Sequence, residues 1–210
     1  MSEYHKIETL YVRDEKTFKV DPSQLKNRTY SLIKSWQFTE KIDGTNIRCI
    51  WKNGTLTFGG KTDNAQIHAD LVRWLYENVS AAEMAEIFPD NDAVIYGEGY
   101  GAGIQKGGGY SPTKKLIVFD VLVGDKWWLS WENTCDVAAK LGLDVVPFVG
   151  EMSLEEATEM VRLGFDSRLQ SGHDGKNPKI KAEGLVGRTA EALFDKKGHR
   201  LIVKLKTKDF

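Results

Sequence analysis

A lysine that precedes an Asp-Gly pair is the first group in the chain that could do chemistry. The segment from residue 40 reads Glu-Lys-Ile-Asp-Gly-Thr-Asn and places the lysine at Lys41 and the carboxylate at Asp43. A lysine amine attacks an electrophile only when it is deprotonated, and its free pKa is about 10.4. Lowering that pKa to about 7–8 costs on the order of 4 kcal/mol, which burial, neighbouring cations or a metal ion can supply. Asp43 opposes this change unless a metal ion lies between the two groups, so the pair predicts Mg²⁺.

The same segment also has a simpler interpretation. It could be a charged hairpin turn, with Asp43 and Gly44 at the bend and Lys41 in solvent. If Lys41 is instead a nucleophile, Gly44 has a different use, because a residue without a side chain lets the backbone approach a ligand closely. The two interpretations predict different surroundings for Lys41.

Alternating lysines near the end of the chain form a second candidate group. In the segment LIVKLKTK, a strand would point Lys204, Lys206 and Lys208 to one face and the apolar residues between them to the other. Ammonium groups that converge on phosphates stabilise the charge that develops during phosphoryl transfer. The alternative is a solubilising edge strand whose lysines prevent aggregation.

Three carboxylates lie in or beside segments that read as strands. Glu98 is in a glycine-rich stretch, Glu183 precedes Gly184, and Asp120 follows Phe119 inside the apolar run LIVFDVLV. A carboxylate in such a run must be partnered or functional, because burying it alone is costly. Phe119 is either ordinary core, the commoner role, or a ring that stacks on a base.

The glycine-rich stretch from residue 97 fits a loose dinucleotide-binding fingerprint, GEGYGA. That fingerprint requires a helix to begin there and face the pyrophosphate. Here more glycines follow at residues 107–109, and then Pro112 and another strand-like run. A dinucleotide-binding fold is therefore excluded.

Strands joined by hairpins, with a few helices between them, must position these residues. Asn53-Gly54 is the strongest hairpin signal, Gly124-Asp125 is another, and Ser153 with Glu156 has capping-box spacing. The pattern predicts an α+β fold of antiparallel sheets flanked by helices, not a βαβ succession. Strands are expected at 37–41, 47–51, 55–58, 93–96, 116–123, 126–131, 184–187 and 201–206, and helices at 67–79, 81–88, 133–142 and 153–163.

Composition sets the remaining bounds. The chain has 210 residues, of which 41% are hydrophobic, and we expect a single domain over 1–210. The formal net charge of -1 means that any surface for nucleic acid must be local. The two cysteines, Cys49 and Cys135, fit neither zinc spacing nor a disulfide framework. The N-terminus is polar and no apolar run could span a bilayer, so we expect a cytoplasmic protein without a membrane partner.

The candidate motifs occur together in one order. KIDGTN begins at 41, GEG at 97, FDV at 119, EGLV at 183 and KLK at 204. This order resembles that of the covalent nucleotidyltransferases, the superfamily of ATP-dependent DNA ligases, RNA ligases and mRNA capping enzymes. Thr45-Asn46, the GEGYG and IQKGGG stretch and the terminal KTKDF are most similar to the RNA ligase 2 branch, including its small phage-type members. The likeness begins at about Phe38, and residues 1–37 match only vaguely.

This resemblance implies a nucleotidyltransferase (ATP-grasp-like) fold and a role for each matched residue. Lys41 would attack the α-phosphate of ATP to form a lysyl-AMP, while Lys204 and Lys206 grip the phosphates. Asp43 and Glu183 would hold Mg²⁺ or Mn²⁺. The resemblance also implies that Glu40 reads the exocyclic amine of adenine, Glu98 binds the ribose hydroxyls, Phe119 stacks on adenine, Asn46 lies near the metal or the ribose, and Asp120 and Gly44 support the site.

The chain departs from the family pattern in two ways. Lys61 stands where an arginine is usual, and a lysine cannot make the bidentate contact of a guanidinium with an RNA phosphate. After the last motif no OB-type or helical domain is expected, so RNA would be held by the core, a second copy of the chain or a helper protein.

The resemblance therefore implies an ATP-dependent RNA ligase that joins 3′-OH and 5′-phosphate ends through an RNA-adenylate, in a bacterial or phage-infected cell. The alternatives are a GTP-dependent capping guanylyltransferase, a DNA nick-sealing ligase and a non-catalytic module that binds RNA ends. Nicked duplexes, single strands and tRNA breaks all stay open as substrates.

Overall fold

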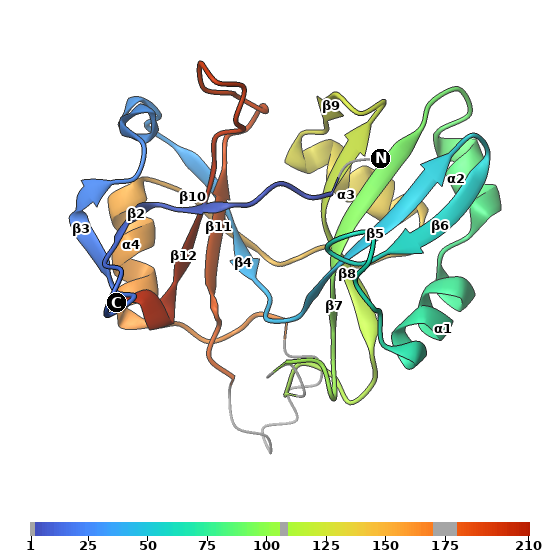
Figure 1. Ribbon diagram of the computed structural model, residues 1–210, viewed down its shortest axis with the longest axis horizontal. Coiled ribbons are helices and arrows are strands. Elements are labelled where there is room, and N and C mark those ends of the chain that lie inside the picture. The colour runs from blue at the N-terminus through green and yellow to red at the C-terminus, as the bar shows by residue number, and fades with distance from the viewer. Residues whose placement is uncertain (1–2, 106–108, 170–179) are drawn as a thin grey trace. The chain divides into compact units, whose positions relative to one another are not determined.

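The computed structural model describes residues 3–105, 109–169 and 180–210. The chain forms two compact units, and each is discontinuous in sequence (Figure 1). Unit 1 comprises Met1–His5 and Asp43–Val146, and unit 2 comprises Lys6–Ile42 and Pro147–Phe210. One boundary between the units thus falls inside the Lys-Ile-Asp-Gly motif.

Unit 1 is built on a five-stranded antiparallel sheet. Its strand order is β6-β5-β7-β8-β9. Side chains from one face of the sheet, such as Ile47 and Cys49, form a single core with three helices. The bounds are β5 Thr45–Lys52, β6 Thr55–Gly59, β7 Ala93–Tyr100, β8 Lys115–Val123 and β9 Trp127–Trp128, with α1 Ala69–Asn78, α2 Ala81–Ile87 and α3 Trp131–Lys140.

Unit 2 is built on a second five-stranded sheet. Its strand order is β1-β12-β11-β4-β10, and all pairs are antiparallel except β1 with β12. A two-stranded ribbon of β2 and β3 and the helix α4 complete the unit around a core that includes Trp36 and Phe38. The bounds are β1 Glu8–Thr9, β2 Tyr11–Arg13, β3 Val20–Leu25, η1 Arg28–Leu32, β4 Trp36–Lys41, β10 Phe148–Met152, α4 Leu154–Leu163, β11 Gly184–Arg188, β12 Ile202–Lys206 and η3 Thr207–Asp209.

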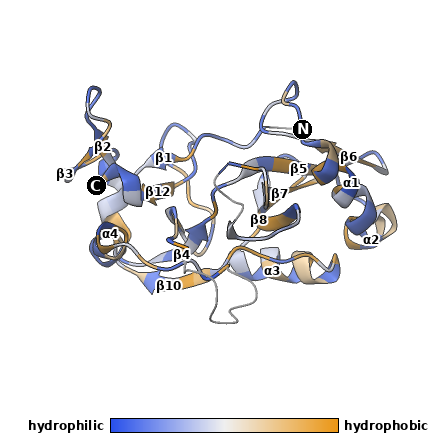
Figure 2. Ribbon diagram, turned by 90° about the horizontal axis from the view of Figure 1, so that it is seen from below, coloured by the Kyte–Doolittle hydropathy of each residue, from blue (hydrophilic) through white to orange (hydrophobic). Residues whose placement is uncertain are grey.

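The α+β class and most of the expected elements are confirmed. The Asn53-Gly54 turn joins β5 to β6 with positive φ at both residues, and Ser153 and Glu156 form the expected capping box. In Figure 2, α3 and α4 each carry hydrophobic and hydrophilic colours, as helices with one buried face do. In the part of the chain that the structure describes, no helix is both long and apolar enough to cross a membrane.

Several local predictions were wrong. The strand expected at 126–131 is only Trp127–Trp128, because Ser130 caps the helix that starts at Trp131. Lys208 does not continue the lysine strand, which ends at Lys206 before a 3₁₀ turn. Nor is β12 an edge strand, since it lies between β1 and β11. The glycine-rich loop expected at 107–109 lies largely outside the described residues.

The simple hairpin interpretation of residues 40–46 was also wrong. The strands on either side of Asp43-Gly44 do not pair with each other. β4 pairs with β10 and β11 in unit 2, whereas β5 pairs with β6 and β7 in unit 1. The segment is therefore a connection between two sheets, and its charged residues are fixed by different neighbours.

Candidate active site

Three strands of unit 2 bring Lys41 and Lys206 beside one carboxylate. Gly184 of β11 is the register partner of Lys41 on β4 and of Lys206 on β12. Glu183 immediately precedes this row, and its two oxygens are 2.7 Å from the Lys41 Nζ and 2.9 Å from the Lys206 Nζ. The structure therefore brings together residues from three of the motifs found in the sequence.

Gly184 makes this close row possible. A Cβ atom at Gly184 would lie 1.9 Å from the carbonyl oxygen of Leu205, which is a backbone atom and cannot turn aside. Only glycine allows β11 to lie so close to β12 at this point. The spacing between β12, which carries Lys206, and the segment of Glu183 therefore depends on a glycine at position 184.

Glu183 remains ionised because of its two partners. Its burial raises its pKa, but the charges and hydrogen bonds of Lys41 and Lys206 outweigh burial and hold the pKa below its usual value. The side chain of Glu183 is 14% exposed, and those of the two lysines are 22% and 18% exposed. Each ion pair is thus largely shielded from water. In this environment the attraction between the charges is stronger than it would be at the surface.

Lys204 is the third cation of this group. It is two residues before Lys206 on β12, on the face opposite the core residues Val203 and Leu205. Burial lowers its pKa to about 8, helped by the charges of Lys206 and Lys41. A buried ammonium beside two others is unfavourable in the protein alone and becomes favourable when anionic phosphates arrive.

Glu40 lies in a different environment from Lys41, although the two are adjacent. It is 1% exposed, and its carboxylate accepts hydrogen bonds from the Ser167 hydroxyl at 2.5 Å and the Arg168 backbone N–H at 2.8 Å. Burial raises its pKa, and these two donors only partly offset that effect. Both donors follow α4, so the segment after that helix orients Glu40, which the sequence pattern did not indicate.

Arg188 is a further cation of the sheet that the sequence analysis missed. It is the last residue of β11 and is 3% exposed, and its Nη2 donates a 3.4 Å hydrogen bond to the buried hydroxyl of Thr39. Register pairing places Thr39 opposite Val186, two residues from Arg188. The signal was present, because an arginine in the run Gly-Leu-Val-Gly-Arg is a charge in a buried strand.

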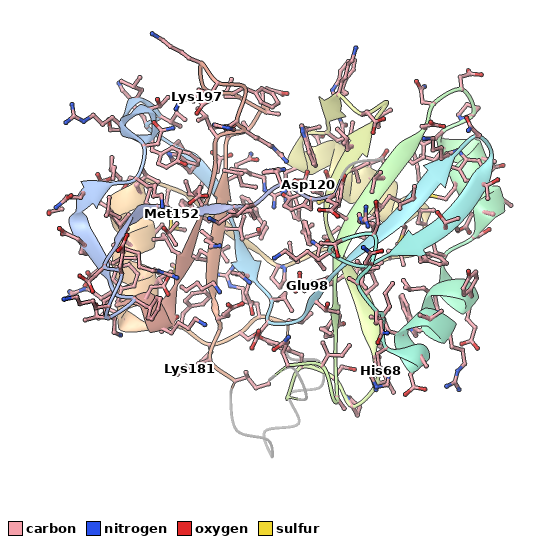
Figure 3. The ribbon with its side chains drawn as sticks, viewed as in Figure 1. His68, Glu98, Asp120, Met152, Lys181 and Lys197 are labelled. Carbon is pink, nitrogen blue, oxygen red and sulfur yellow. The ribbon has the colours of Figure 1, made fainter. Side chains whose placement is uncertain are left out.

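The second face of the unit 1 sheet carries the other predicted residues. Asn46 on β5 lies directly opposite Glu98 on β7, and Arg48 lies opposite Tyr96. Figure 3 shows Glu98 and Asp120 on this sheet. The Oδ1 atom of Asn46 is buried and has no hydrogen-bond partner among the described residues. An unsatisfied buried acceptor is costly, and a ligand hydroxyl or a hydrated cation would satisfy it.

A bulge in β8 turns Phe119 and Asp120 to one face. Tyr96 pairs with Asp120 but the next residue, Gly97, pairs with Val118, so Phe119 is the extra residue. Asp120 is fully buried and accepts a 2.8 Å hydrogen bond from the Tyr4 hydroxyl. The Tyr4 ring also meets the Phe119 ring edge-on, with centroids 5.1 Å apart. The N-terminal segment therefore helps to fix Phe119, a role that the sequence did not show.

Lys61 lies in a loop that Arg48 holds. The Arg48 guanidinium is 1% exposed and donates to the Gly60 carbonyl oxygen at 2.8 Å and to Asp63 at 2.7 Å. A Cβ atom at Gly59 would lie 3.0 Å from its Nη2. The arginine beside this loop therefore comes from β5, while Lys61 itself is exposed to solvent.

Gly44 has a structural reason to be glycine. A Cβ atom there would lie 2.3 Å from the Gly99 carbonyl oxygen and 2.8 Å from the Glu98 side chain. The close approach that Gly44 allows in the structure is therefore to strand β7, within unit 1, whereas the approach to a nucleotide stays a prediction. A nucleotide could also approach the backbone closely at Gly44, because this residue has no side chain.

A divalent cation fits the donors present only if it is shared with a ligand. No group of three or more His, Cys, Asp or Glu residues that could hold a metal occurs in the described ranges. Mg²⁺ commonly uses one or two carboxylates together with phosphate oxygens and water. Glu183 of unit 2 could supply one such carboxylate, but it would have to exchange a lysine partner, since both its oxygens form ion pairs. The other predicted metal ligand, Asp43, belongs to unit 1.

Comparisons with known proteins place this geometry in a wider context. Residues 34–206 match the RNA ligase family, and a search of curated proteins found no match. An RNA ligase variant from Naegleria gruberi, solved with ATP and Mn, is similar with a TM-score of 0.63 and 18% identity, over 84% of this chain and 52% of that one. A second variant of that ligase, without ligand, has a TM-score of 0.66 and 17% identity, over 98% and 59%.

A third variant of the same enzyme, with AMP and Mn, has a TM-score of 0.65 and 16% identity, over 96% of this chain and 61% of that one. These likenesses show that the fold is that of an RNA ligase nucleotidyltransferase. The chain spans about half to three fifths of the length of these structures. Since the family match itself extends over most of the sequence, the chain belongs to the RNA ligase family.

Proposed function

We propose that the protein is an ATP-dependent RNA ligase that joins a 3′-OH to a 5′-phosphate through a lysyl-AMP on Lys41. The observation that carries this proposal is the pairing of Lys41 and Lys206 with the two oxygens of Glu183. A solvated turn lysine would have no such neighbours. The similar Naegleria gruberi structures contain ATP or AMP with Mn, which supports the choice of nucleotide.

The reaction has three phosphoryl transfers. The Lys41 amine attacks the α-phosphorus of ATP, so a P–N bond forms, the α–β P–O bond breaks and pyrophosphate leaves. The 5′-phosphate of an RNA then attacks the same phosphorus and releases Lys41. Finally an RNA 3′-OH attacks the activated 5′-phosphorus, which forms the phosphodiester and expels AMP.

The residues around Lys41 would act mainly by balancing the charges of its amine and of the phosphates. A lysine amine attacks only in its neutral form, so the ion pair of Lys41 with Glu183 must be broken before the attack. A divalent cation supplies positive charge at the phosphates when bound. Glu183 and Asp43 would hold it, and Lys204 and Lys206 would balance the charge that develops on the leaving pyrophosphate.

The remaining roles concern the nucleotide itself. Phe119 would stack on adenine, Glu98 would accept hydrogen bonds from the ribose hydroxyls, and Asn46 would bind near the ribose or the metal. Glu40 would select adenine over guanine by accepting a hydrogen bond from the exocyclic amine of adenine. Asp120 and Gly44 would support these residues, and Lys61 would contact the RNA end.

Labelling with nucleotide tests the first step. Protein incubated with Mg²⁺ and α-labelled ATP should become radioactive, and the Lys41→Ala variant should not, because it lacks the attacking amine. Lys52→Ala changes an exposed lysine of β5 and is the matched control, which should label normally. A normal yield of adduct on Lys41→Ala would place the nucleophile elsewhere.

The same assay separates the rival functions. Label from GTP alone would indicate a capping guanylyltransferase, and the absence of any adduct would favour a module that only binds RNA ends. Ligation assays with matched RNA and DNA ends distinguish RNA joining from DNA nick sealing.

We also propose a cytoplasmic setting, with which the two free cysteines agree. Residues 1–210 would form a single nucleotidyltransferase domain. This domain would act alone, as a homo-oligomer or with a helper protein.

A further inference from the structure

We infer that the hairpin of residues 189–201, between β11 and β12, binds a single-stranded segment of the RNA substrate. The inference rests on the proposed function, because it identifies the surface that holds the RNA for that reaction. In Figure 1 the hairpin projects from the end of β11 and β12, and Figure 3 shows Lys197 near its tip. Its arms pair through Phe194 and Arg200, and the Leu201 N–H donates to the Leu193 carbonyl oxygen at 2.7 Å.

Exposed apolar side chains and cations occur together on this hairpin. Phe194 is 48% exposed and Leu193 is 47% exposed. Lys196 and Lys197 are exposed at the tip, and Arg200 is paired with Phe194 across the arms. An accessible ring on which a base can stack, beside cations that meet phosphates, is how proteins hold single strands without reading their sequence.

The Asp195 carboxylate closes the turn at the tip. The Asp195 side chain accepts hydrogen bonds from the backbone N–H groups of Lys197 and His199. Its Oδ2 lies 3.3 Å from the His199 ring nitrogen. The hydrogen bond from His199 is the largest of the effects that lower the pKa of Asp195. These hydrogen bonds hold the turn, in which Lys196 and Lys197 are exposed.

The position of the hairpin is as important as its composition. The chain as a whole has a formal net charge of -1, so RNA must be held by a local basic surface. Arg200 is four residues from Lys204, so their backbones are at most about 14 Å apart. That distance is no longer than about four nucleotides of a stacked strand at about 3.4 Å each, and an unstacked single strand covers it with fewer. A strand that enters the site of Lys204 and Lys206 would thus reach the hairpin with its next few nucleotides.

A second hairpin of unit 2 provides a matched control. The turn between β2 and β3 also carries an exposed aromatic ring, Phe18, which is 65% exposed, and an exposed lysine, Lys16. It belongs to a separate two-stranded sheet and does not continue β11 or β12. If non-specific binding by any turn with an exposed aromatic ring and an exposed lysine explained RNA binding, both hairpins would bind RNA equally.

The test measures binding of a 5′-phosphorylated 12-nucleotide single-stranded RNA by fluorescence anisotropy at several salt concentrations. Lys196→Gln with Lys197→Gln should weaken binding at least tenfold and reduce the salt slope by about 1.4, because each lysine that contacts a phosphate of a single strand contributes about 0.7. Phe194→Ala should weaken binding by roughly fivefold or more and leave the slope unchanged, as loss of stacking predicts. Lys16→Gln with Phe18→Ala should bind as the unchanged protein does.

Adenylylation of Lys41 needs no RNA, so it separates this inference from the proposed function. The hairpin variants should form the lysyl-AMP at the normal yield and melt at the normal temperature. Unchanged RNA affinity in both hairpin variants would overturn the inference, and so would an equal loss in the Lys16 and Phe18 variant. Failure of the unchanged protein to form any adduct would instead contradict the proposed function, whatever the RNA affinity.

Discussion

At the scale of single residues, Glu183 controls the charge around Lys41. Its lowered pKa means that the folded protein holds the ionised form more strongly than the unfolded chain does. The stability it contributes is therefore present above the unfolded pKa of about 4.5 and is lost as the pH falls through the lower folded value. Both lysines depend on this one carboxylate, so its loss affects binding and stability together.

Replacement of this carboxylate tests both effects. Glu183→Gln should abolish adenylylation and lower the free energy of unfolding by roughly 3 kcal/mol, because breaking a buried pair leaves uncompensated charge. Urea titration at pH 7 and at pH 3 measures this, and the difference from the unchanged protein should shrink at the lower pH. Asp136→Asn breaks the exposed pair with Lys140 and should cost at most about 1 kcal/mol. An equal cost for both variants would mean that burial does not matter here.

Lys204 leads to a prediction with the opposite sign for stability. Its pKa is lowered to about 8, so the charged form is less stable in the folded protein than in the unfolded chain. Between about pH 8 and 10.5 the unfolded chain binds more protons at this site, and stability from this group rises with pH. Lys204→Met should therefore stabilise the protein at pH 7, by at most about 3 kcal/mol, while weakening ATP use. A lower melting temperature of this variant at pH 7 would contradict the argument.

The pH profile of activity provides an independent check on Lys204. In the free enzyme, deprotonation near pH 8 removes one phosphate-binding charge, so kcat/KM for ATP should decline above that pH. The Lys204→Arg variant keeps a positive charge at this position, so its kcat/KM for ATP should decline only at higher pH. If the two profiles coincide, another group causes the decline.

At the scale of elements, the sequence predicted what is local and missed what pairs at long range. The β5–β6 hairpin and the capping box of α4 depend on neighbouring residues, and both were found. The placement of β12 between β1 and β11 depends on a strand of two residues near the N-terminus, which has no pattern of its own. For that reason the edge-strand interpretation could not be dismissed from the sequence.

The candidate site follows the same division. Lys41, Glu183 and Lys206 could be expected in one site because their motifs resemble those of the covalent nucleotidyltransferases. Tyr4 and Ser167 could not, since each reaches its carboxylate through a contact more than 100 residues away in sequence. A tyrosine or serine far from any motif gives no local signal of such a contact.

Gly184 allows a test of how elements set the site. Gly184→Ala would place a Cβ atom 1.9 Å from the Leu205 carbonyl oxygen, so β11 and β12 must separate. We expect adenylylation to fall at least tenfold and stability to fall by roughly 1–3 kcal/mol, the usual range for overpacking. Gly198→Ala is the comparison, because a Cβ there has nothing within 4 Å, although its positive φ adds some strain. Similar adenylylation by the two variants would show that strand spacing is unimportant.

At the scale of the whole molecule, nucleotide binding should be visible in thermal stability. A ligand at 100 times its dissociation constant stabilises the folded state by about 2.7 kcal/mol. For a chain of 210 residues this corresponds to roughly 5–10 °C in melting temperature. Measured on Lys41→Ala with Mg²⁺, so that no adduct forms, ATP should produce this shift and GTP should not. An equal shift with GTP would contradict the role proposed for Glu40.

The discontinuity of the two units also has a consequence for synthesis on the ribosome. Unit 1 needs nothing beyond Val146, whereas β4 of unit 2 waits for β10 and β11, which are made later. Domains generally fold as units while the chain emerges. Lys41 is thus synthesised well before its carboxylate and lysine neighbours, since Glu183 follows it by 142 residues. A nascent or truncated chain that lacks β12 could not bring these neighbours to Lys41, so this assembly would be restricted to chains that extend past Lys206.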